Sequence, residues 1–447
     1  MKRYEKYKYS GIDWIGEIPE HWESIRLKYI GYLYGGLAGK SANDFNQESN
    51  FNNKPFIPFT NICNNKIINP TQLQYVVIAE DEQQNQVAKG DLFFMMSSEN
   101  FDDVGKSSIL LDDLEETYLN SFCKGFRFTT EKYYPPFINY LLLSKAYRSL
   151  VLTEANGYTR INLKIDKIND IPLKTPPTLD EQIAIANYLD LKTEEIDQLI
   201  KQKEELLLLF EEEKTAIINH AVTKGINPVA KLKDSKIDWL GEIPEHWILK
   251  KLKYVAQINP TKDNFIDKES IELVVFLPME KVKETGEIDC ELKRPIQELW
   301  NGFTFFRRND VIIAKITPCF ENGKGAFLKN LETEFGFGST EFHVLRSNKA
   351  IMSKYLFYLT RSELFMKIGE AFMIGAAGQK RVPTDFISEF KFPIPPKEEQ
   401  EQILEFIDTE TSRIYSKVEK TKRLIEQLKE YKTALISEVS TGKVKVN

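Results

Sequence analysis

The 447-residue sequence predicts an α+β protein: two pseudo-symmetric mixed α/β domains separated by two long helices that pair as an antiparallel coiled coil. Two observations carry this prediction. The phrase IDWIGEIPEHW at Ile12–Trp22 returns as IDWLGEIPEHW at Ile237–Trp247, with Leu240 in place of Ile15 as the only change. Each half of the chain then ends in a long proline-free segment with a heptad pattern of apolar residues. Repetition over such a distance indicates duplicated domains.

The duplication extends beyond the phrase, and its matched segments place the domain boundaries. The matched pairs are RLKYI (Arg26–Ile30) with KLKYV (Lys251–Val255), GDLFF (Gly90–Phe94) with NDVII (Asn309–Ile313), Gly105-Lys106 with Gly323-Lys324, and GYTR (Gly157–Arg160) with GQKR (Gly378–Arg381). The runs GDLFF and NDVII are apolar enough to form buried strands. We therefore expect mixed domains at residues 1–175 and 226–394, and helical segments at 176–225 and 395–447.

Each helical segment has recognisable ends and an apolar seam. Thr178 and Glu181 fit a capping box after a Pro-Pro pair, and Gly225 and Gly442 are suited to end the helices. Positions spaced alternately by four and three residues form a matched seam: Ile196, Ile200, Lys203, Leu207, Phe210, Lys214 and Ile217 in the first segment, and Ile414, Val418, Thr421, Ile425, Leu428, Lys432 and Leu435 in the second. This spacing predicts a coiled coil. The two seams are expected to pair antiparallel; burial of each helix in its own domain is the alternative.

Composition indicates a globular protein of the reduced cytoplasm. Hydrophobic residues make up 42% of the chain, no apolar run reaches the roughly 20 residues that cross a bilayer, and the polar start MKRYEKYKYSG lacks a signal core. Four cysteines without a CxxC pair argue against a disulfide framework. The net charge of −6 arises in Thr178–Gly225, which holds eleven acidic and five basic residues. Trp300–Lys391 holds thirteen basic and nine acidic residues, which suits either a polyanion or an ordinary mixed surface.

The sequence contains no complete catalytic or cofactor motif. YYPPF (Tyr133–Phe137) has Tyr134 where the tetrapeptide of amino-methyltransferases needs Asn or Asp, and no glycine-rich S-adenosylmethionine loop accompanies it. GKS (Gly105–Ser107) has Asn100 where a phosphate-binding loop needs glycine. The four histidines lie too far apart in the sequence for a local metal cluster. We therefore expect a non-catalytic chain without a metal site: two related readers of a two-part target, or a tether between two protein partners.

Several runs together resemble type I restriction–modification specificity subunits. They are GEIPEHW…LK in both halves, DVIIAKITPCFENGKGA (Asp310–Ala326), GSTEFHVLR (Gly338–Arg346) and the PP…EEQ…I…FID helix start (Pro395–Asp408). The resemblance covers nearly the whole chain. It implies two target recognition domains, each reading one half of a bipartite site in double-stranded DNA. It also implies that the helices are spacers that dock two methyltransferase subunits.

The same resemblance assigns the chemistry to partner subunits. S-adenosylmethionine, ATP and Mg are expected on the methyltransferase and endonuclease/translocase subunits, and no cofactor is expected on this chain. The first domain is less typical, because MMSSENFDDVGKSS (Met95–Ser108) and LNSFCKGFRF (Leu119–Phe128) replace two of the runs. Two alternatives stay open. One is a coiled-coil scaffold of another complex without sequence-specific DNA binding, and the other is a single-chain methyltransferase, against which the missing cofactor loop argues.

Matched loops in the two domains carry the candidate DNA contacts. Long basic and polar side chains in such loops can reach guanine edges or phosphates. The candidates are Lys106, Tyr158, Thr159 and Arg160 in the first domain, and Thr317, Asn322, Lys324, Gln379, Lys380 and Arg381 in the second. The alternative for each is an ordinary loop residue. The tryptophans of the repeated phrase are expected to pack in the core or between domains rather than to stack on bases: Trp14, Trp22, Trp239 and Trp247.

Overall fold

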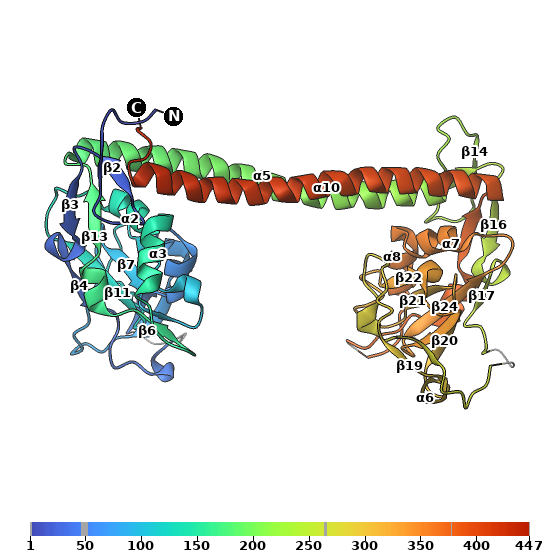
Figure 1. The fold of residues 1–447 in the computed structure, drawn as a ribbon. Coiled ribbons are helices and arrows are strands. Elements are labelled where there is room, and N and C mark those ends of the chain that lie inside the picture. Colours follow the sequence, from blue (N-terminus) through green and yellow to red (C-terminus); the bar gives the residue numbers. More distant parts are fainter. Residues whose placement is uncertain (1, 46–51, 263–265, 377, 447) are drawn as a thin grey trace. The chain divides into compact units, whose positions relative to one another are not determined.

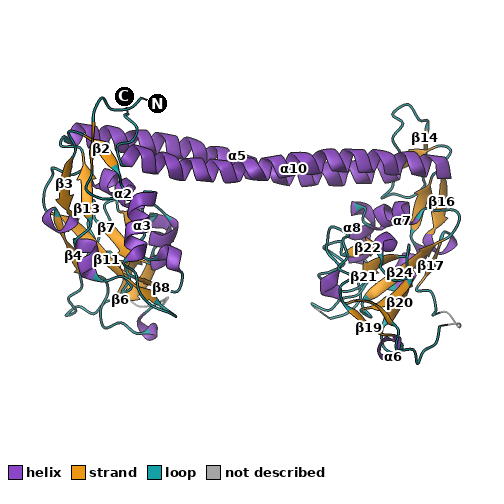
Figure 2. Cartoon of the chain, viewed as in Figure 1, coloured by secondary structure: helices purple, strands orange, loops and turns teal. Residues whose placement is uncertain are grey.

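The computed structural model describes residues 2–45, 52–262, 266–376 and 378–446, and the chain falls into two compact units. Unit 1 comprises Met1–Glu204 and Lys422–Asn447, and unit 2 comprises Glu205–Thr421. Each unit holds one mixed α/β domain and a portion of each long helix (Figure 1 and Figure 2). The long helices are α5 (Leu179–Lys224) and α10 (Lys397–Ser440), of 46 and 44 residues.

The first domain is built on a four-stranded antiparallel sheet and a three-stranded sheet. The larger sheet has the order β4 (Gly31–Gly35), β11 (Cys123–Phe128), β7 (Leu92–Met95) and β9 (Ser107–Ile109). The smaller has the order β10 (Tyr118–Leu119), β5 (Asn53–Ile57) and β6 (Gln74–Val77), with β10 parallel to β5. Three strand pairs complete the β-structure: β1 (Tyr7–Tyr9) with β2 (Glu17–Pro19), β3 (Glu23–Arg26) with β13 (Pro172–Thr175), and β8 (Ser97–Ser98) with β12 (Ile161–Asn162). The α-helices of this domain are α1 (Phe59–Asn64), α2 (Pro135–Leu143), α3 (Lys145–Thr153) and α4 (Ile165–Asn169).

The second domain repeats the larger sheet and adds a strand to the smaller one. Its larger sheet has the order β17 (Ala256–Ile258), β24 (Phe342–Ser347), β21 (Val311–Ala314) and β22 (Gly325–Phe327). The other sheet has the order β19 (Lys293–Pro295), β18 (Leu273–Leu277), β23 (Phe335–Gly338) and β20 (Thr304–Arg307), with β18 parallel to β23. Two strand pairs complete the β-structure: β14 (Leu232–Asp234) with β15 (Glu242–Pro244), and β16 (Ile248–Lys251) with β25 (Lys391–Ile394). The α-helices of this domain are α6 (Ile296–Leu299), α7 (Ser353–Thr360), α8 (Glu363–Ala371) and α9 (Thr384–Glu389).

Strands β7 and β21 hold the same place in the two larger sheets. Both are continuous apolar runs in which every residue is buried, as expected for strands covered on both faces. Leu92 pairs with Ile109 as Val311 pairs with Phe327, so the hydrogen-bond register is repeated as well. The buried strands expected from GDLFF and NDVII are confirmed.

Within each unit, α5 and α10 pack on each other along the predicted seam. In unit 1, Ile196 of α5 shares an apolar cluster with Leu435 near the end of α10. In unit 2, Glu213 near the end of α5 lies 3.1 Å from Arg413 near the start of α10. The pairing is therefore antiparallel, and the alternative of two separately buried helices is rejected. The apolar seam residues are all buried or half-buried: Ile196, Ile200, Leu207, Phe210, Ile217, Ile414, Val418, Ile425, Leu428 and Leu435.

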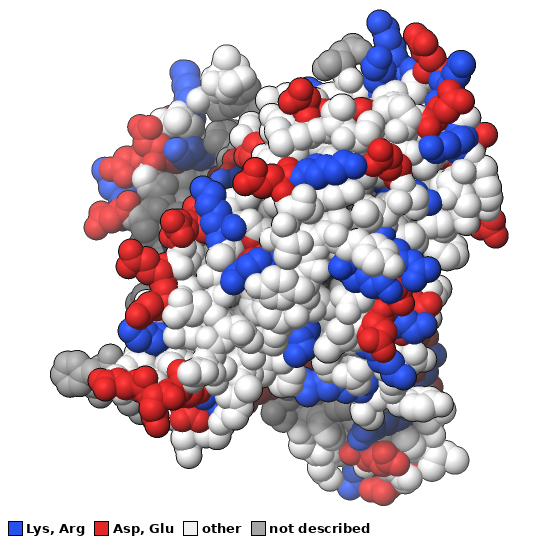
Figure 3. Space-filling view, turned by 90° about the vertical axis from the view of Figure 1, so that its left-hand side faces the viewer, with Lys and Arg blue, Asp and Glu red and all other residues white. Residues whose placement is uncertain are grey.

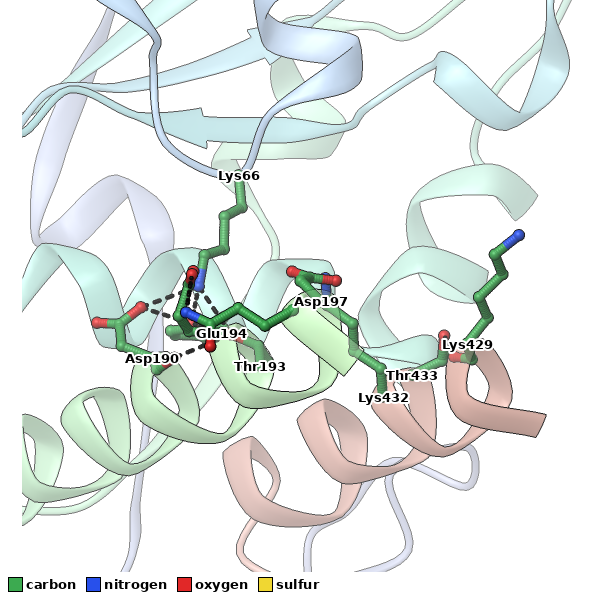
Figure 4. A network of polar contacts seen from close by, with 10 residues as sticks. Lys66, Asp190, Thr193, Glu194, Asp197, Lys429, Lys432 and Thr433 are labelled. Carbon is green, nitrogen blue, oxygen red and sulfur yellow. Dashed lines mark hydrogen bonds and ion pairs between the residues drawn. The ribbon is translucent and has the colours of Figure 1, made fainter. Parts of the chain in front are cut away.

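Polar contacts fix the start of α5 to its domain on one side and to α10 on the other (Figure 4). Lys66, in the segment after α1, places its ammonium 3.0 Å from Asp190 Oδ1 and 2.9 Å from Thr193 Oγ1. Two turns further along α5, Asp197 accepts a hydrogen bond of 2.6 Å from Lys432 of α10. Charged pairs on both sides of one stretch of helix restrict its rotation, which keeps the apolar seam turned toward α10.

The repeated phrase anchors the start of each long helix. Trp22 is fully buried, and its indole Nε1 donates to Glu181 Oε1 at 3.2 Å in the first turn of α5. His21 Nε2 lies 2.9 Å from the other oxygen of the same carboxylate. The predicted capping box is wrong, because no described hydrogen bond joins the side chain of Thr178 or of Glu181 to the backbone N–H of the other; Glu181 instead serves as the acceptor that the buried indole requires. The first turn of α5 is thereby attached to the phrase.

The second copy of the phrase repeats this arrangement and receives the end of the opposite helix. Trp247 is fully buried and donates to Glu399 Oε2 at 3.0 Å in the first turn of α10. Gly225 follows α5 with φ +77°, and a Cβ there would lie 3.1 Å from the Trp247 ring. Gly442 follows α10 with φ +76°, and a Cβ there would lie 3.0 Å from Trp22. The predicted glycine stops are confirmed, and each phrase joins the start of one long helix to the end of the other.

The other tryptophan of the phrase differs between the copies. Trp239 is half-buried against Phe390, with ring centroids 4.8 Å apart. Trp14 is 52% exposed, so its predicted place in a core is wrong. The residue that stands in for Phe390 in the first domain is Ile171, since Leu27 donates to the carbonyl of Ile171 as Leu252 does to that of Phe390. An aliphatic side chain offers Trp14 less surface to pack on.

Two further observations concern the chain as a whole. Among the described residues, no helix is both long enough and apolar enough to cross a membrane. The four cysteines are free thiols. Burial raises the pKa of Cys63 to about 11, so this thiol stays protonated at neutral pH.

Candidate nucleic-acid interface

Each domain presents a short hairpin loop whose ends are held by paired backbone hydrogen bonds. In the first domain Asn156 and Asn162 exchange N–H···O bonds of 3.0 and 2.9 Å. In the second domain Ile374 and Arg381 exchange bonds of 3.0 and 2.9 Å. The exposed candidates in these loops are Tyr158, Thr159 and Arg160, and Gln379, Lys380 and Arg381. Polar side chains on exposed hairpins whose ends are paired suit contact with a large partner surface.

In the second domain, the other candidate loop lies beside this hairpin. Ile316 forms a bridge with Arg381. Thr317 donates its N–H to the Lys380 carbonyl at 3.0 Å, and the Lys380 N–H donates to Thr317 Oγ1 at 3.2 Å. The structure therefore brings Thr317, Lys380 and Arg381 together, although they lie far apart in the sequence.

The strand register corrects one match between the domains. Ser97 pairs with Asn162, and Ile316 pairs with Arg381. Ser97 and Ile316 hold the same place after β7 and β21, so the counterpart of Arg381 is Asn162. The match of Arg160 with Arg381 is wrong. The second loop has six residues between its paired ends and the first has five. Because the loops differ in length, matching identical residues does not align them correctly.

Both loop arginines nevertheless lie on the same position of the sheet. Phe122 and Glu341 occupy this position, each one residue before β11 or β24. The Arg160 guanidinium lies 4.4 Å from the centroid of the Phe122 ring, which is a cation–π contact. Arg381 instead forms a bidentate ion pair with Glu341, with Nη2–Oε1 at 2.8 Å and Nε–Oε2 at 2.9 Å. The same position of the sheet thus holds one arginine in each domain, through a cation–π contact in the first domain and an ion pair in the second.

The glycine–lysine match agrees with the backbone. Gly105 and Gly323 have φ values of +70° and +68°, a left-handed conformation that favours glycine. The following lysines differ in their contacts. Lys106 is paired with Asp103 at 2.6 Å, so it braces its own loop. Lys324 is half-buried, and its ammonium forms no hydrogen bond or ion pair with the residues that the structure describes.

The last candidate of the sequence analysis is Asn322, between the cis Thr317–Pro318 bond and Lys324. It is exposed, and its Nδ2 donates to Glu284 Oε1 at 2.9 Å. Asn322 is thus at the surface but already has one partner within its own domain.

Sequence reasoning missed two charged residues at this surface. Lys315 donates to a backbone carbonyl at 2.8 Å, and burial lowers its pKa. Glu341 holds the arginine, and the Arg381 guanidinium lowers the pKa of its carboxyl. Both residues lie inside the family-like runs Asp310–Ala326 and Gly338–Arg346. Their presence in these runs is the sequence feature that could have identified both residues.

A buried histidine beneath this surface predicts a pH-dependent stability. His343 is 2% exposed, it donates from Nε2 to the Val382 carbonyl at 2.9 Å, and Asn259 Nδ2 lies 3.2 Å from its Nδ1. Burial lowers its pKa to about 4, against the hydrogen bond to the Val382 carbonyl and the charge of Glu341, which raise it; the charge of Lys315 adds to the lowering. Since an unfolded histidine has a pKa of about 6.5, only the unfolded chain gains a proton between pH 6.5 and 4. The contribution of His343 to the free energy of unfolding is therefore fully present above this window. It is lost as pH falls through the window, by roughly 2 kcal/mol between pH 7 and 5.

This pH dependence is measured by urea unfolding at pH 7 and pH 5 with the wild type and His343→Gln. Glutamine can keep a hydrogen bond to the Val382 carbonyl but does not titrate. The variant is expected to lose about 2 kcal/mol less than the wild type on acidification. Equal losses in both proteins would mean that His343 takes up its proton without cost.

Charge is mixed over the face of the molecule drawn in Figure 3. Lysines and arginines alternate with acidic residues across broad uncharged areas. Among the described residues there is also no group of three or more His, Cys, Asp or Glu side chains that could hold a metal ion. The exposed loops, rather than a single-sign field on this face or a metal centre, are therefore the distinguishing feature.

Comparisons with known proteins point to one family. The family model described as "Type I restriction modification DNA specificity domain" matches residues 19–208 and 244–430. The EcoAI specificity subunit of Escherichia coli is 36% identical over 201 residues, which are 45% of this chain and 33% of that protein. The EcoEI subunit of the same organism is 34% identical over the same shares. This chain thus aligns with only a third of the length of these two relatives.

Matches over the full length exist at lower identity. A putative type I restriction enzyme MjaX specificity subunit of Methanocaldococcus jannaschii is 27% identical over 97% of this chain and 96% of its own. The crystal structure of the HsdS subunit from Thermoanaerobacter tengcongensis matches with a TM-score of 0.57 at 15% identity, covering 96% and 98% of the two chains. A chain from a structure of a type I R-M system matches with a TM-score of 0.65 at 14% identity, covering 96% and 99%. At these identities the structures establish the fold alone.

Proposed function

This chain belongs to the family of type I restriction–modification DNA specificity subunits, and we propose from this that each of its domains reads one half of a bipartite site in double-stranded DNA. The observation that carries the proposal is the pair of exposed hairpins at corresponding places in two domains. A duplicated reader matches a two-part site, because the arrangement of half-sites mirrors the arrangement of the domains that bind them. Arg160 makes a cation–π contact whereas Arg381 forms an ion pair, and this difference fits two half-sites of different sequence.

The hairpin side chains are suited to the two kinds of contact that DNA offers. The Lys380 ammonium is exposed and suits a phosphate, whereas the partly exposed guanidinium of Arg381 suits a base edge. Thr317 and Gln379 add uncharged hydrogen-bonding groups beside them. In the first domain Tyr158 is fully exposed, and its ring and hydroxyl are free to contact sugar or base.

The long helices are proposed to dock two methyltransferase subunits. Apart from the seam, both helices expose large apolar side chains that a second helix face could cover. They are Leu191, Leu199, Leu424 and Tyr431 in unit 1, and Leu208, Leu209, Phe406 and Tyr415 in unit 2. Leu208 is 68% exposed and Tyr415 is 67% exposed, so most of each side chain is available to a partner.

In this proposal the chain contributes recognition in the cytoplasm and the partners contribute chemistry. The methyltransferase subunits bind S-adenosylmethionine, and the endonuclease/translocase subunits bind ATP and Mg. The chain alone then methylates and cleaves nothing. A scaffold without DNA specificity would share the exposed helix faces but would have no use for two distinct arginine-bearing hairpins.

Substitution of one hairpin arginine tests the division into two readers. Arg381→Ala should weaken binding through one half-site only, by about 1–3 kcal/mol if the contact is to a base. Binding is measured at constant salt on the intact site and on duplexes with either half scrambled. The duplex that lacks the half read by the second domain should be insensitive to the substitution.

The matched control is Lys367→Ala, which removes an exposed cation of α8 outside the hairpins. It should bind all three duplexes as the wild type does. Equal loss by Arg381→Ala on both scrambled duplexes would indicate a phosphate contact or a folding defect. Absence of any preference of the wild type for the intact site would reject the proposed function in favour of the scaffold.

A further inference from the structure

The Arg381 side chain is fixed at both of its ends. At the backbone, Arg381 is bridged to Ile374 on one side and to Ile316 on the other. At the guanidinium, Nε lies 2.9 Å from Glu341 Oε2 and 3.1 Å from Oε1, and Nη2 lies 2.8 Å from Oε1. The side chain is still 48% exposed. A long side chain held this way has already lost much of the rotamer freedom that binding would otherwise restrict.

Glu341 is itself held in place by its surroundings. Its backbone N–H lies 3.2 Å from Ser339 Oγ, and its carbonyl accepts a 2.7 Å bond from the Lys315 N–H. Its side chain is 25% exposed, and the Arg381 guanidinium keeps the pKa of the carboxyl low, so it is ionised at neutral pH. The carboxylate is thus a fixed, charged platform rather than a mobile surface group.

This pairing determines which edge of the guanidinium remains for a ligand. Glu341 occupies the edge formed by Nε and Nη2. Among the described contacts, Nη1 has no partner, and Nη2 keeps a second N–H. The pair of donors at the tip, Nη1 and Nη2, therefore faces away from the carboxylate. Two parallel N–H donors of arginine are the match for the O6 and N7 acceptors of guanine in the major groove.

We propose that Glu341 is a positioning residue that orients Arg381 for an end-on, bidentate contact with one guanine in the half-site of the second domain. The inference rests on the proposed function and deepens it by naming a base and the residue that enforces its reading. The first domain provides the contrast. Phe122 stands at the position of Glu341 and holds Arg160 only by its ring face, which directs no particular N–H edge. The strict guanine requirement is therefore assigned to the second domain.

Binding to site duplexes in which 7-deazaguanine replaces one guanine at a time tests the inference. This base lacks the N7 acceptor and keeps the shape and pairing of guanine. The wild type should lose roughly tenfold in affinity at one guanine of one half-site. Arg381→Ala should show no further loss at that guanine. Glu341→Ala, which leaves Arg381 without an acceptor, should reduce the loss to less than about threefold, because it weakens binding to the normal duplex more than binding to the substituted one.

The controls separate positioning from a merely structural role. Glu389→Gln removes another ion-paired carboxylate of the same domain, outside the hairpin, and should keep the full tenfold sensitivity expected for the contact. Glu341→Gln, nearly isosteric, serves if the alanine variant unfolds. A Glu341 variant that weakens binding to normal and substituted duplexes equally, with their ratio unchanged, overturns the inference.

The two proposals fail in distinguishable ways. If the wild type does not prefer the bipartite duplex to a scrambled one, the proposed function is wrong. If it prefers the bipartite duplex but no 7-deazaguanine substitution in either half affects binding, or if the sensitive guanine is insensitive to Arg381→Ala, only the inference about Glu341 and Arg381 is wrong.

Discussion

Alanine at Trp247 is expected to destabilise the protein by about 3–5 kcal/mol. The indole is fully buried, packs against Gly225 after α5, and donates a 3.0 Å hydrogen bond to Glu399 in α10. The substitution opens a cavity at the meeting point of two helix ends, and it removes a donor from a carboxylate that is itself 18% exposed. Chemical denaturation of the full chain, followed by circular dichroism, measures the loss.

The repeated phrase supplies its own controls for this experiment. Trp22→Ala should cost a similar amount in unit 1, because its indole is equally buried and equally bonded. Trp14→Ala should change stability by less than about 0.5 kcal/mol, since that side chain is 52% exposed. A Trp247→Ala variant no less stable than Trp14→Ala would show that the phrase does not anchor the helices.

Insertion of one heptad into both long helices should change the spacing of the recognised half-sites and leave their sequences unchanged. The insertions belong between the Asp197–Lys432 and Glu213–Arg413 contacts, where seven added residues on each side keep the apolar seam in phase. Each helix gains about 10 Å at 1.5 Å per residue. With 3.4 Å per base pair, a helix pair that sets the spacing moves the half-sites apart by roughly three base pairs. Mapping of DNA methylation in cells measures the new spacing.

Insertion into α5 alone is the matched control for the paired insertion. It leaves one heptad of the α5 seam without a partner in α10, so it should lower stability and activity together. Methylation by the paired-insertion variant at the original half-site spacing would show that the helix pair is not the ruler.

Sequence reasoning succeeded where the signal was local or literally repeated. The seams from Ile196 to Ile217 and from Ile414 to Leu435 follow from heptad spacing, and the helix ends follow from Gly225 and Gly442. The buried strand at Leu92–Met95 follows from a continuous apolar run. These features depend on residues that are close in the sequence, so the sequence alone is enough to predict them.

Sequence reasoning failed where a side chain finds its partner across the fold. Glu181 fits a capping box, but Trp22 takes its carboxylate from 159 positions away. The contact between Glu341 and Arg381 depends on the pairing of β24 and β21 and on the bridge at Ile316. Aligning Arg160 with Arg381 by letter missed an extra loop residue that only the hydrogen-bond register reveals.

The central claim is that this chain selects a bipartite DNA site for partner enzymes. Adenine methylation mapped across the genome, in cells with the partner methyltransferase and either with or without this chain, tests it most directly. Methylation at a single two-part motif should appear only when the chain is present, and exchange of residues 226–394 for the corresponding domain of a relative should alter one part of the motif. The same motif methylated without the chain, or both parts altered by that exchange, would contradict the account.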